Sequence, residues 1–142
     1  MSDSDLIKLY SGRILQLAAA IPHLGRLAEP GATAKKRSPL CGSTVTVDLV
    51  MKDGRVAEFA QDVKACALGQ ASAAVLGAVV LGRSLAELEA ARDALSAMLK
   101  EGGPVPAAPF DGYEVLLPAR DYKNRHASIL LALEATCAAA AG

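Results

Sequence analysis

The segment from residue 43 to residue 64 alternates apolar and polar side chains with the two-residue period of a β-strand. Two such runs, 43–52 and 55–64, are separated by Asp53-Gly54, a dipeptide that favours a tight hairpin turn. The pattern therefore predicts two antiparallel strands. The side chains expected to face the core are Val45, Val47, Leu49, Met51, Ala57, Phe59 and Val63, and those expected to face away are Thr44, Thr46, Asp48, Glu58, Asp62 and Lys64.

The regions around this hairpin follow the helical period instead. We expect a helix of small side chains that begins at Cys66 and a further helix that begins with a capping box at Ser84-Leu85-Ala86-Glu87. The remaining expected elements are a first helix over 5–20, an irregular connector over 21–31, a short edge strand over 32–38, a loop over 102–109, a short helix or turn over 110–117, a break at Pro118 and a last helix over 121–140. This order predicts one α+β domain over residues 1–142, with a small three-stranded antiparallel sheet and helices packed on one face.

Composition narrows the function classes. Apolar residues make up 52% of the chain but aromatic residues only 4%, which suits closely packed helices with small side chains. Lys plus Arg and Asp plus Glu number 15 each, so net charge provides no attraction to nucleic acid or to an anionic membrane. The acidic start and the short apolar runs predict a cytoplasmic protein without a signal peptide or a membrane span. Three cysteines then favour reduced thiols over a disulfide framework.

The run Lys35-Lys36-Arg37 lies on the expected edge strand. Our main interpretation is a solvated edge that blocks strand-to-strand aggregation, because cationic side chains on an edge oppose pairing with another sheet. The alternative interpretation is a basic docking patch.

Cys41 and Cys66 flank the predicted hairpin, so folding should bring them to its open end. Cys66 also opens a helix, whose N-terminal N–H groups and dipole stabilise a thiolate. A thiolate binds metals and attacks sulfur, so the pair is a candidate metal or sulfur site. The alternative for each cysteine is a small buried apolar residue.

Two further residues are weaker candidates. His126 lies on the last helix, where an imidazole could ligate zinc or iron or could equally be a surface or half-buried side chain. Cys137 follows eleven residues later, about 16 Å along a helix, and cannot reach the same ion. We therefore interpret Cys137 as a packing residue.

Other chemistries lack their motifs. The glycines do not have the spacing of a phosphate-binding loop, and no serine lies on a strand–turn–helix elbow. The carboxylates show no paired acid–base arrangement, so an enzyme function is not indicated.

Several motifs resemble the scaffold family of iron–sulfur cluster assembly that includes IscU, SufU and NifU. Ser38-Pro39-Leu40-Cys41-Gly42-Ser43 resembles the family's Asn-Pro-x-Cys-Gly-Asp signature. The segment 64–73 looks like its Gly-Cys-x-x-x-x-x-Ala-Ser-Ala motif, and 125–130 resembles its last-helix segment. Leu9-Tyr10 and Pro22-His23-Leu24-Gly25 resemble its opening region, and the stretch between Leu99 and Asp121 is similar to the insertion of the SufU branch.

The resemblance implies a fold of three antiparallel strands with helices and a role in taking sulfur from a cysteine desulfurase. It implies Cys41 and Cys66 as ligands of a transient Fe–S cluster or of zinc and as persulfide acceptors, with His126 auxiliary. Two positions depart from the family pattern, because Ser43 replaces the aspartate and Ala127 replaces the third cysteine. A site of three thiolates and one carboxylate is therefore impossible, which leaves two thiolates, with His126 as an auxiliary ligand and Ser43 as a weak one.

Three hypotheses follow. The first is a scaffold-like protein with this reduced site, which binds iron or zinc, accepts sulfur and serves apo-protein cluster acceptors as a monomer or weak homo-oligomer. The second is a sulfur-relay partner of a cysteine desulfurase that holds no cluster. The third is a binding module that kept the fold, lost the chemistry and binds no metal.

Overall fold

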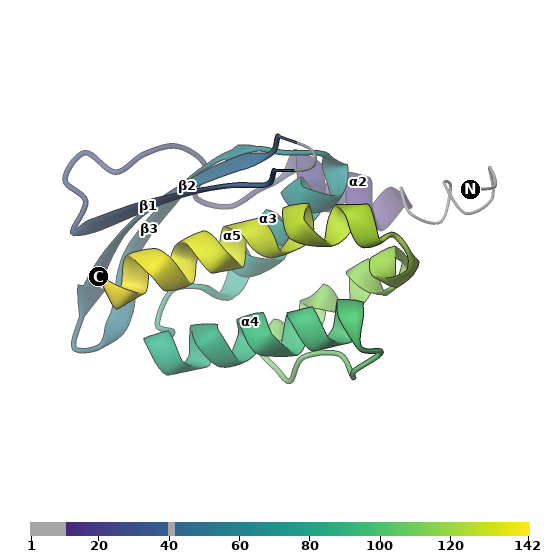
Figure 1. The fold of residues 1–142 in the computed structure, drawn as a ribbon. Coiled ribbons are helices and arrows are strands. Elements are labelled where there is room, and N and C mark those ends of the chain that lie inside the picture. The colour runs from purple at the N-terminus through teal and green to yellow at the C-terminus, as the bar shows by residue number, and fades with distance from the viewer. Residues whose placement is uncertain (1–10, 40–41) are drawn as a thin grey trace.

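The protein's structure, a computed structural model, describes residues 11–39 and 42–142. Its sheet has three antiparallel strands in the order β1 (Ala32–Arg37), β2 (Thr44–Lys52) and β3 (Arg55–Lys64). The turn between β2 and β3 is the predicted Asp53-Gly54 pair, and both residues adopt positive φ, 55° and 75°. The predicted hairpin is therefore confirmed, together with the edge strand (Figure 1).

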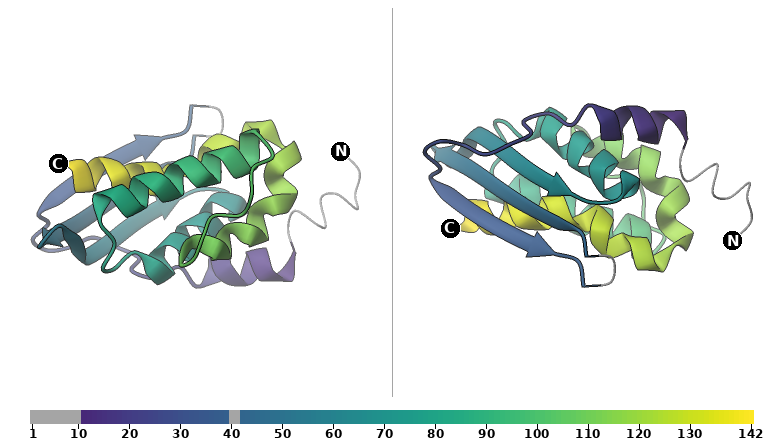
Figure 2. Two further views of the ribbon diagram at one scale, coloured as in Figure 1. Left: turned by 90° about the horizontal axis from the view of Figure 1, so that it is seen from below. Right: turned by 90° about the horizontal axis from the view of Figure 1, so that it is seen from above.

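The helices cover one face of this sheet in two layers. The long helix α5 (Lys123–Ala141) crosses beneath β1 and β2 and contacts α3 (Ala67–Val79), while α4 (Leu85–Lys100) lies on the far side of α5 (Figures 1 and 2). The short helix α2 (Gly12–Ala19) packs against α3, and the 3-10 helix η1 (Phe110–Asp121) joins α4 to α5. The predicted α+β fold is confirmed.

Local signals set several element boundaries. Ser84 Oγ accepts a hydrogen bond from the Glu87 backbone N–H, and the Ser84 N–H donates to Glu87 Oε1, which completes the predicted capping box of α4. Ser11 Oγ likewise accepts from Ile14 N–H at the start of α2. The first six residues of the expected helix over 5–20, including Leu9 and Tyr10, lie outside the described residues.

The prediction that Ala57 faces the core is wrong. The pairing of β2 with β3 shifts between Val50 and Met51, so that Met51 pairs with Val56 and Val50 pairs with Glu58. Ala57 is the extra residue of this β-bulge and is exposed, whereas Val56 is buried in its place. The alternating pattern of one strand cannot reveal a bulge. One extra residue shifts the pairing with the neighbouring strand, so the residues on one side of the bulge face opposite to the way that strict alternation predicts.

The predicted break at Pro118 is also wrong. The 3-10 turns of η1 continue through Pro118 to Asp121, and α5 begins at Lys123. Proline disrupts the interior of an α-helix because it lacks an N–H donor. Pro118 does not end the 3-10 helix η1. The end comes at Tyr122, whose φ of −111° and ψ of 76° are not helical.

Asp48 points away from the helices as expected, yet its side chain is fully buried. The connector before β1 lies over this part of the sheet and brings Arg26, whose Nε and Nη2 donate to the two carboxylate oxygens over 2.6 and 3.1 Å. The Leu27 N–H and the Thr33 hydroxyl donate to the same carboxylate. These hydrogen bonds, led by that from Arg26, lower the pKa of Asp48 to about 2.

The crossing of α3 and α5 depends on small residues. A Cβ added to Gly69 would lie 2.7 Å from Ser128 Oγ, which shows that the two helix surfaces touch at this glycine. One turn further along, Ser72 Oγ donates to the Ile129 carbonyl over 2.6 Å. This crossing lies near the start of α5. It therefore fixes the position of the first turns of α5 relative to α3.

No helix in the described ranges is long and apolar enough to cross a membrane.

The buried carboxylate predicts a pH-dependent stability. The pKa of Asp48 is lowered in the folded state, so its contribution is complete above the unfolded-state value near 3.8 and is lost as the pH falls toward 2. We expect Asp48→Asn to lower the free energy of unfolding by about 2 kcal/mol at pH 7, measured by urea denaturation. The difference from the wild type should shrink at pH 3. Asp53→Asn, at an exposed turn position, is the control; an equal loss there would contradict this role of Asp48.

The helix crossing predicts a different response at two helical glycines. Gly69→Ala places a methyl group against Ser128 and Ala65, so we expect a loss of about 1–3 kcal/mol in the free energy of unfolding. Gly12→Ala is the matched control, because nothing lies within 4 Å of its Cβ position and alanine favours a helix. Gly12→Ala should be neutral or stabilising, and equal losses at both glycines would argue against a close crossing.

Candidate thiol site

Cys66 lies between β3 and α3, as the N-cap residue of α3. Its φ of −67° and ψ of 170° are extended, and its side chain makes no capping hydrogen bond to the helix. The residue is half-buried, and no acidic side chain occupies the first turn of α3. The thiol therefore lies where free N–H groups and the helix dipole favour negative charge.

Ser128 of α5 connects Cys66 to the loop before β2. Its hydroxyl lies 3.5 Å from Cys66 Sγ and 3.0 Å from Ser43 Oγ, and both serines are buried. A thiolate has no proton, so when Cys66 is ionised Ser128 must donate to the sulfur and can in turn accept from Ser43. Two hydroxyls thus form a hydrogen-bonded chain that ends at the Cys66 sulfur.

The second predicted thiol, Cys41, lies outside the described residues. The described residues on either side of it end close together, because the Ser38 N–H donates to the Ser43 carbonyl over 2.8 Å and the Gly42 N–H donates to the Ser38 carbonyl over 3.0 Å. Ser43 and Cys66, at the two ends of the β-hairpin, both contact Ser128, and the predicted approach of Cys41 to Cys66 lies outside the described residues.

His126 lies one residue before Ala127 on α5 and is 3% exposed. Its Nε2 lies 3.0 Å from the carbonyl oxygens of Ala119 and Arg120. Carbonyl oxygens only accept, so Nε2 carries the proton and donates to the end of η1. The ring nitrogen left for any ligand is Nδ1, and the predicted role of His126 as a ligand applies to that atom.

Cys137 is a packing residue, as predicted. It is 4% exposed and belongs to the core cluster. Burial raises the pKa of its thiol to about 11, which keeps it protonated near neutral pH.

Within the described residues, no group of three His, Cys, Asp or Glu side chains is arranged to hold a metal ion. The Ser128 hydroxyl contacts both Cys66 Sγ and Ser43 Oγ, and hydroxyls are hydrogen-bond donors and weak ligands for zinc or iron.

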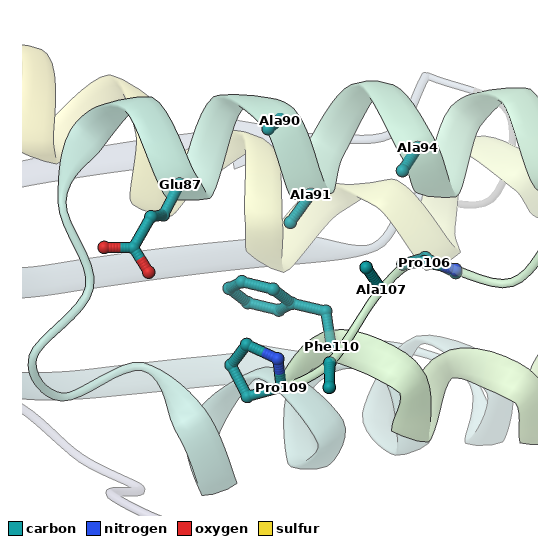
Figure 3. A pocket seen from close by; sticks show the side chains of 9 residues that line it. Glu87, Ala90, Ala91, Ala94, Pro106, Ala107, Pro109 and Phe110 are labelled. Atoms are coloured by element: carbon teal, nitrogen blue, oxygen red, sulfur yellow. The ribbon is translucent and has the colours of Figure 1, made fainter.

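Two of the cavities elsewhere bear on candidate chemistry. One, of about 320 Å³, lies between α4 and residues 106–110 and is lined by alanines, prolines and Phe110, with Glu87 at one end (Figure 3). Glu87 is already paired with Arg55 and Arg83 at 2.9 Å, so this cavity presents no free acid or nucleophile. The other, of about 560 Å³, is lined by His126 and by Leu99, Lys100, Gly102, Arg120, Asp121 and Lys123.

Ser128 is the site residue that sequence analysis missed. The sequence places Ser128 only within the last-helix motif over 125–130 and indicates no role for it. The only signal for it in the sequence is the pair Gly69 and Ser72, because small residues on α3 indicate that another helix approaches closely there. They do not indicate which residue of that helix makes the contact.

The comparisons with solved structures agree with this fold. The N-terminal part of a nitrogen-fixing NifU-like protein from Brucella abortus is 50% identical, with a TM-score of 0.92 over 95% of this chain and 94% of that one. A putative iron–sulfur cluster assembly scaffold protein for the SUF system from Fervidobacterium islandicum AW-1 has 18% identity and a TM-score of 0.83 over 94% and 98%. A hypothetical protein with 22% identity has a TM-score of 0.84 over 96% and 99%. No curated protein matches the chain.

The family model for the NifU-like N-terminal domain matches residues 9–127, a range that includes both cysteine motifs and the start of α5. The chain therefore belongs to the NifU-like N-terminal domain family, the scaffold family of iron–sulfur cluster assembly.

Proposed function

We propose that this protein accepts sulfur from a cysteine desulfurase on Cys66, together with Cys41, and binds iron or zinc through these thiols with fewer ligands than the full family set. The observation that carries the proposal is the position of Cys66 at the start of α3, with Ser128 Oγ 3.5 Å from its sulfur. A helix N-terminus and a hydroxyl donor are in general favourable neighbours for a thiolate, which is the form that reacts.

Sulfur transfer to this thiol needs no added oxidant or reductant. The Cys66 thiolate attacks the outer sulfur of the donor's persulfide, and a new S–S bond forms between that atom and Cys66 Sγ. The S–S bond of the donor breaks, and the donor cysteine leaves as a thiolate. The product is a persulfide on Cys66, and the negative charge leaves on the donor cysteine; once the persulfide passes its proton to that thiolate or to water, its terminal sulfur can accept a hydrogen bond from Ser128.

Metal binding rests on fewer groups. Ala127 has no ligand atom at the position of the family's third cysteine, and the hydroxyl of Ser43 replaces a carboxylate. We expect iron or zinc to be cargo held by two thiolates, with Nδ1 of His126 as auxiliary ligand and at least one open position. This reduced set predicts weaker binding than a closed site, and we place the chain near the SufU branch on its 99–121 insertion.

The second candidate function is a sulfur relay that never holds a cluster. It is favoured by the chain of hydroxyls from Ser43 to Ser128 to Cys66, because hydrogen-bond donors assist a persulfide but contribute little to a metal site. In either case the product would pass to apo-protein acceptors. A loss of all thiol chemistry, with the fold kept as a binding module, is the outcome to be excluded.

Sulfur acceptance can be tested by substitution of single thiols. After incubation with a cysteine desulfurase and cysteine, intact-mass spectrometry should show added sulfur on the wild type and on Cys137→Ser, since the Cys137 thiol is buried. Cys66→Ser should lose most of the addition, and Cys41→Ser shows whether the second thiol shares it. An unmodified wild type, measured against a donor that is active on another acceptor, would reject the proposed sulfur chemistry.

The reduced ligand set predicts a gain of function on repair. Ala127→Cys restores the missing thiol, and we expect the affinity for zinc to rise at least about tenfold, measured by competition with a chromophoric chelator. Ala138→Cys, on the same helix but far along it, is the control for adding a thiol. If Ala127→Cys binds zinc no better than Ala138→Cys, the position of Ala127 is not a ligand position in this chain.

A further inference from the structure

The larger of the two cavities described above collects positive charge. Its volume is about 560 Å³, and its lining comes from the end of α4, the end of η1 and the first turns of α5, which meet at one end of the molecule (Figure 1). Each of these elements brings one cation to the lining: Lys100, Arg120 and Lys123. Asp121 is the one acidic residue in the lining, so the cavity has an excess of two positive charges.

The three cations are not neutralised by carboxylates in the described part of the chain, where the ion pairs involve four other arginines. Arg120 is held by backbone carbonyls instead. Its Nε donates to the Met98 carbonyl over 2.8 Å and its Nη2 donates to the Gly103 carbonyl over 2.9 Å. These bonds satisfy carbonyls at the end of α4 and fix the guanidinium in the wall, with its charge unpaired.

The start of α5 adds to this positive field. No acidic residue lies in its first turn, and its N-cap residue makes no side-chain capping bond. The first N–H groups of a helix have no partner within the helix, and the helix dipole places positive charge there. Lys123 and Arg125 lie in this same turn, where the dipole disfavours a cation. A bound anion would offset both the dipole and the cations.

His126 supplies a buried wall of the cavity. Its Nε2 donates to two carbonyls at the end of η1, and its Nδ1 makes no hydrogen bond to a described residue. In this tautomer Nδ1 can only accept, so it suits a ligand with an O–H group. Ser128, which contacts Cys66, lies two residues on, about 200° around the helix, so the cavity and the thiol site use different faces of α5.

We propose that this cavity binds a small oxyanion with more than one negative charge and an O–H group, either a hydrogen phosphate or a hydroxylated polycarboxylate. Lys100, Arg120 and Lys123 would supply the charge, and the N–H groups at the start of α5 would donate hydrogen bonds. The hollow, lined from three segments, has the size of a small-molecule site. The inference goes beyond the proposed function, because sulfur transfer to a cysteine uses none of these residues.

The test measures anion binding by calorimetry on the reduced, metal-free full chain at low ionic strength. Sodium phosphate and sodium citrate are the two probes, and we expect at least one to bind with one ion per chain and a Kd below about 1 mM. Lys123→Gln should weaken this binding about fivefold, whereas Lys52→Gln should leave it within about twofold. Lys52 is the matched control, since it is an exposed lysine at the end of β2 and does not line the cavity.

A gain of affinity provides a second readout that loss of folding cannot imitate. Asp121→Asn removes the one carboxylate of the lining, and we expect it to tighten binding about threefold. Amide NMR shifts should locate the ion, with the largest changes at residues 99–103 and 119–126.

Tighter binding of phosphate or of citrate identifies the source of the oxyanion, and either result supports the site. Binding of neither probe, equal weakening by Lys123→Gln and Lys52→Gln, or NMR changes centred elsewhere would overturn it. Binding of hexaglutamate without binding of either small anion would also overturn it, in favour of an acidic peptide. Because no sulfur donor is present, this result is independent of whether Cys66 accepts sulfur.

Discussion

The close approach of α3 to α5 is the constraint on which the thiol site depends. Gly69 leaves room for Ser128, and the hydrogen bond from Ser72 to the Ile129 carbonyl holds the next turn of α5 in register. Any larger side chain at Gly69 would displace the helix that brings Ser128 to Cys66. The contact between Ser128 and Cys66 is thus set by a residue without a side chain, since a packed interior has no room for adjustment.

The site differs from the pattern that its motifs resemble in the kind of atom around the sulfur. At Ser43 a hydroxyl stands where the resemblance has a carboxylate, and at Ala127 a methyl stands where it has a thiol. A carboxylate near Cys66 would repel a second negative charge, whereas the hydroxyls of Ser43 and Ser128 can donate to it. The proposed sulfur-accepting role rests on this difference.

The parts of the fold that could be predicted are those set by local chemistry. Asp53-Gly54 specifies a turn through its backbone preference, and Ser84 with Glu87 specifies a helix start through two reciprocal hydrogen bonds. The bulge at Ala57 depends on the partner strand, and the burial of Asp48 depends on a connector that brings Arg26 from 22 residues away. Cys66 was identifiable from its position at a helix start, but Ser128 was not, because only packing of distant helices brings it to the sulfur.

The two edges of the sheet are protected from pairing in different ways. The outer edge of β3 is bridged by Leu24 at Gln61 and by Ser84 at Arg55, so segments of the same chain occupy its hydrogen-bonding groups. The opposite edge of the sheet, among the described residues, is β1, and its protection is electrostatic. If β1 of two molecules paired to form one continuous sheet, Lys35, Lys36 and Arg37 of both molecules would lie close together. The repulsion among these like charges would oppose that pairing. The like charges along β1 therefore act against its pairing with the same strand of a second molecule.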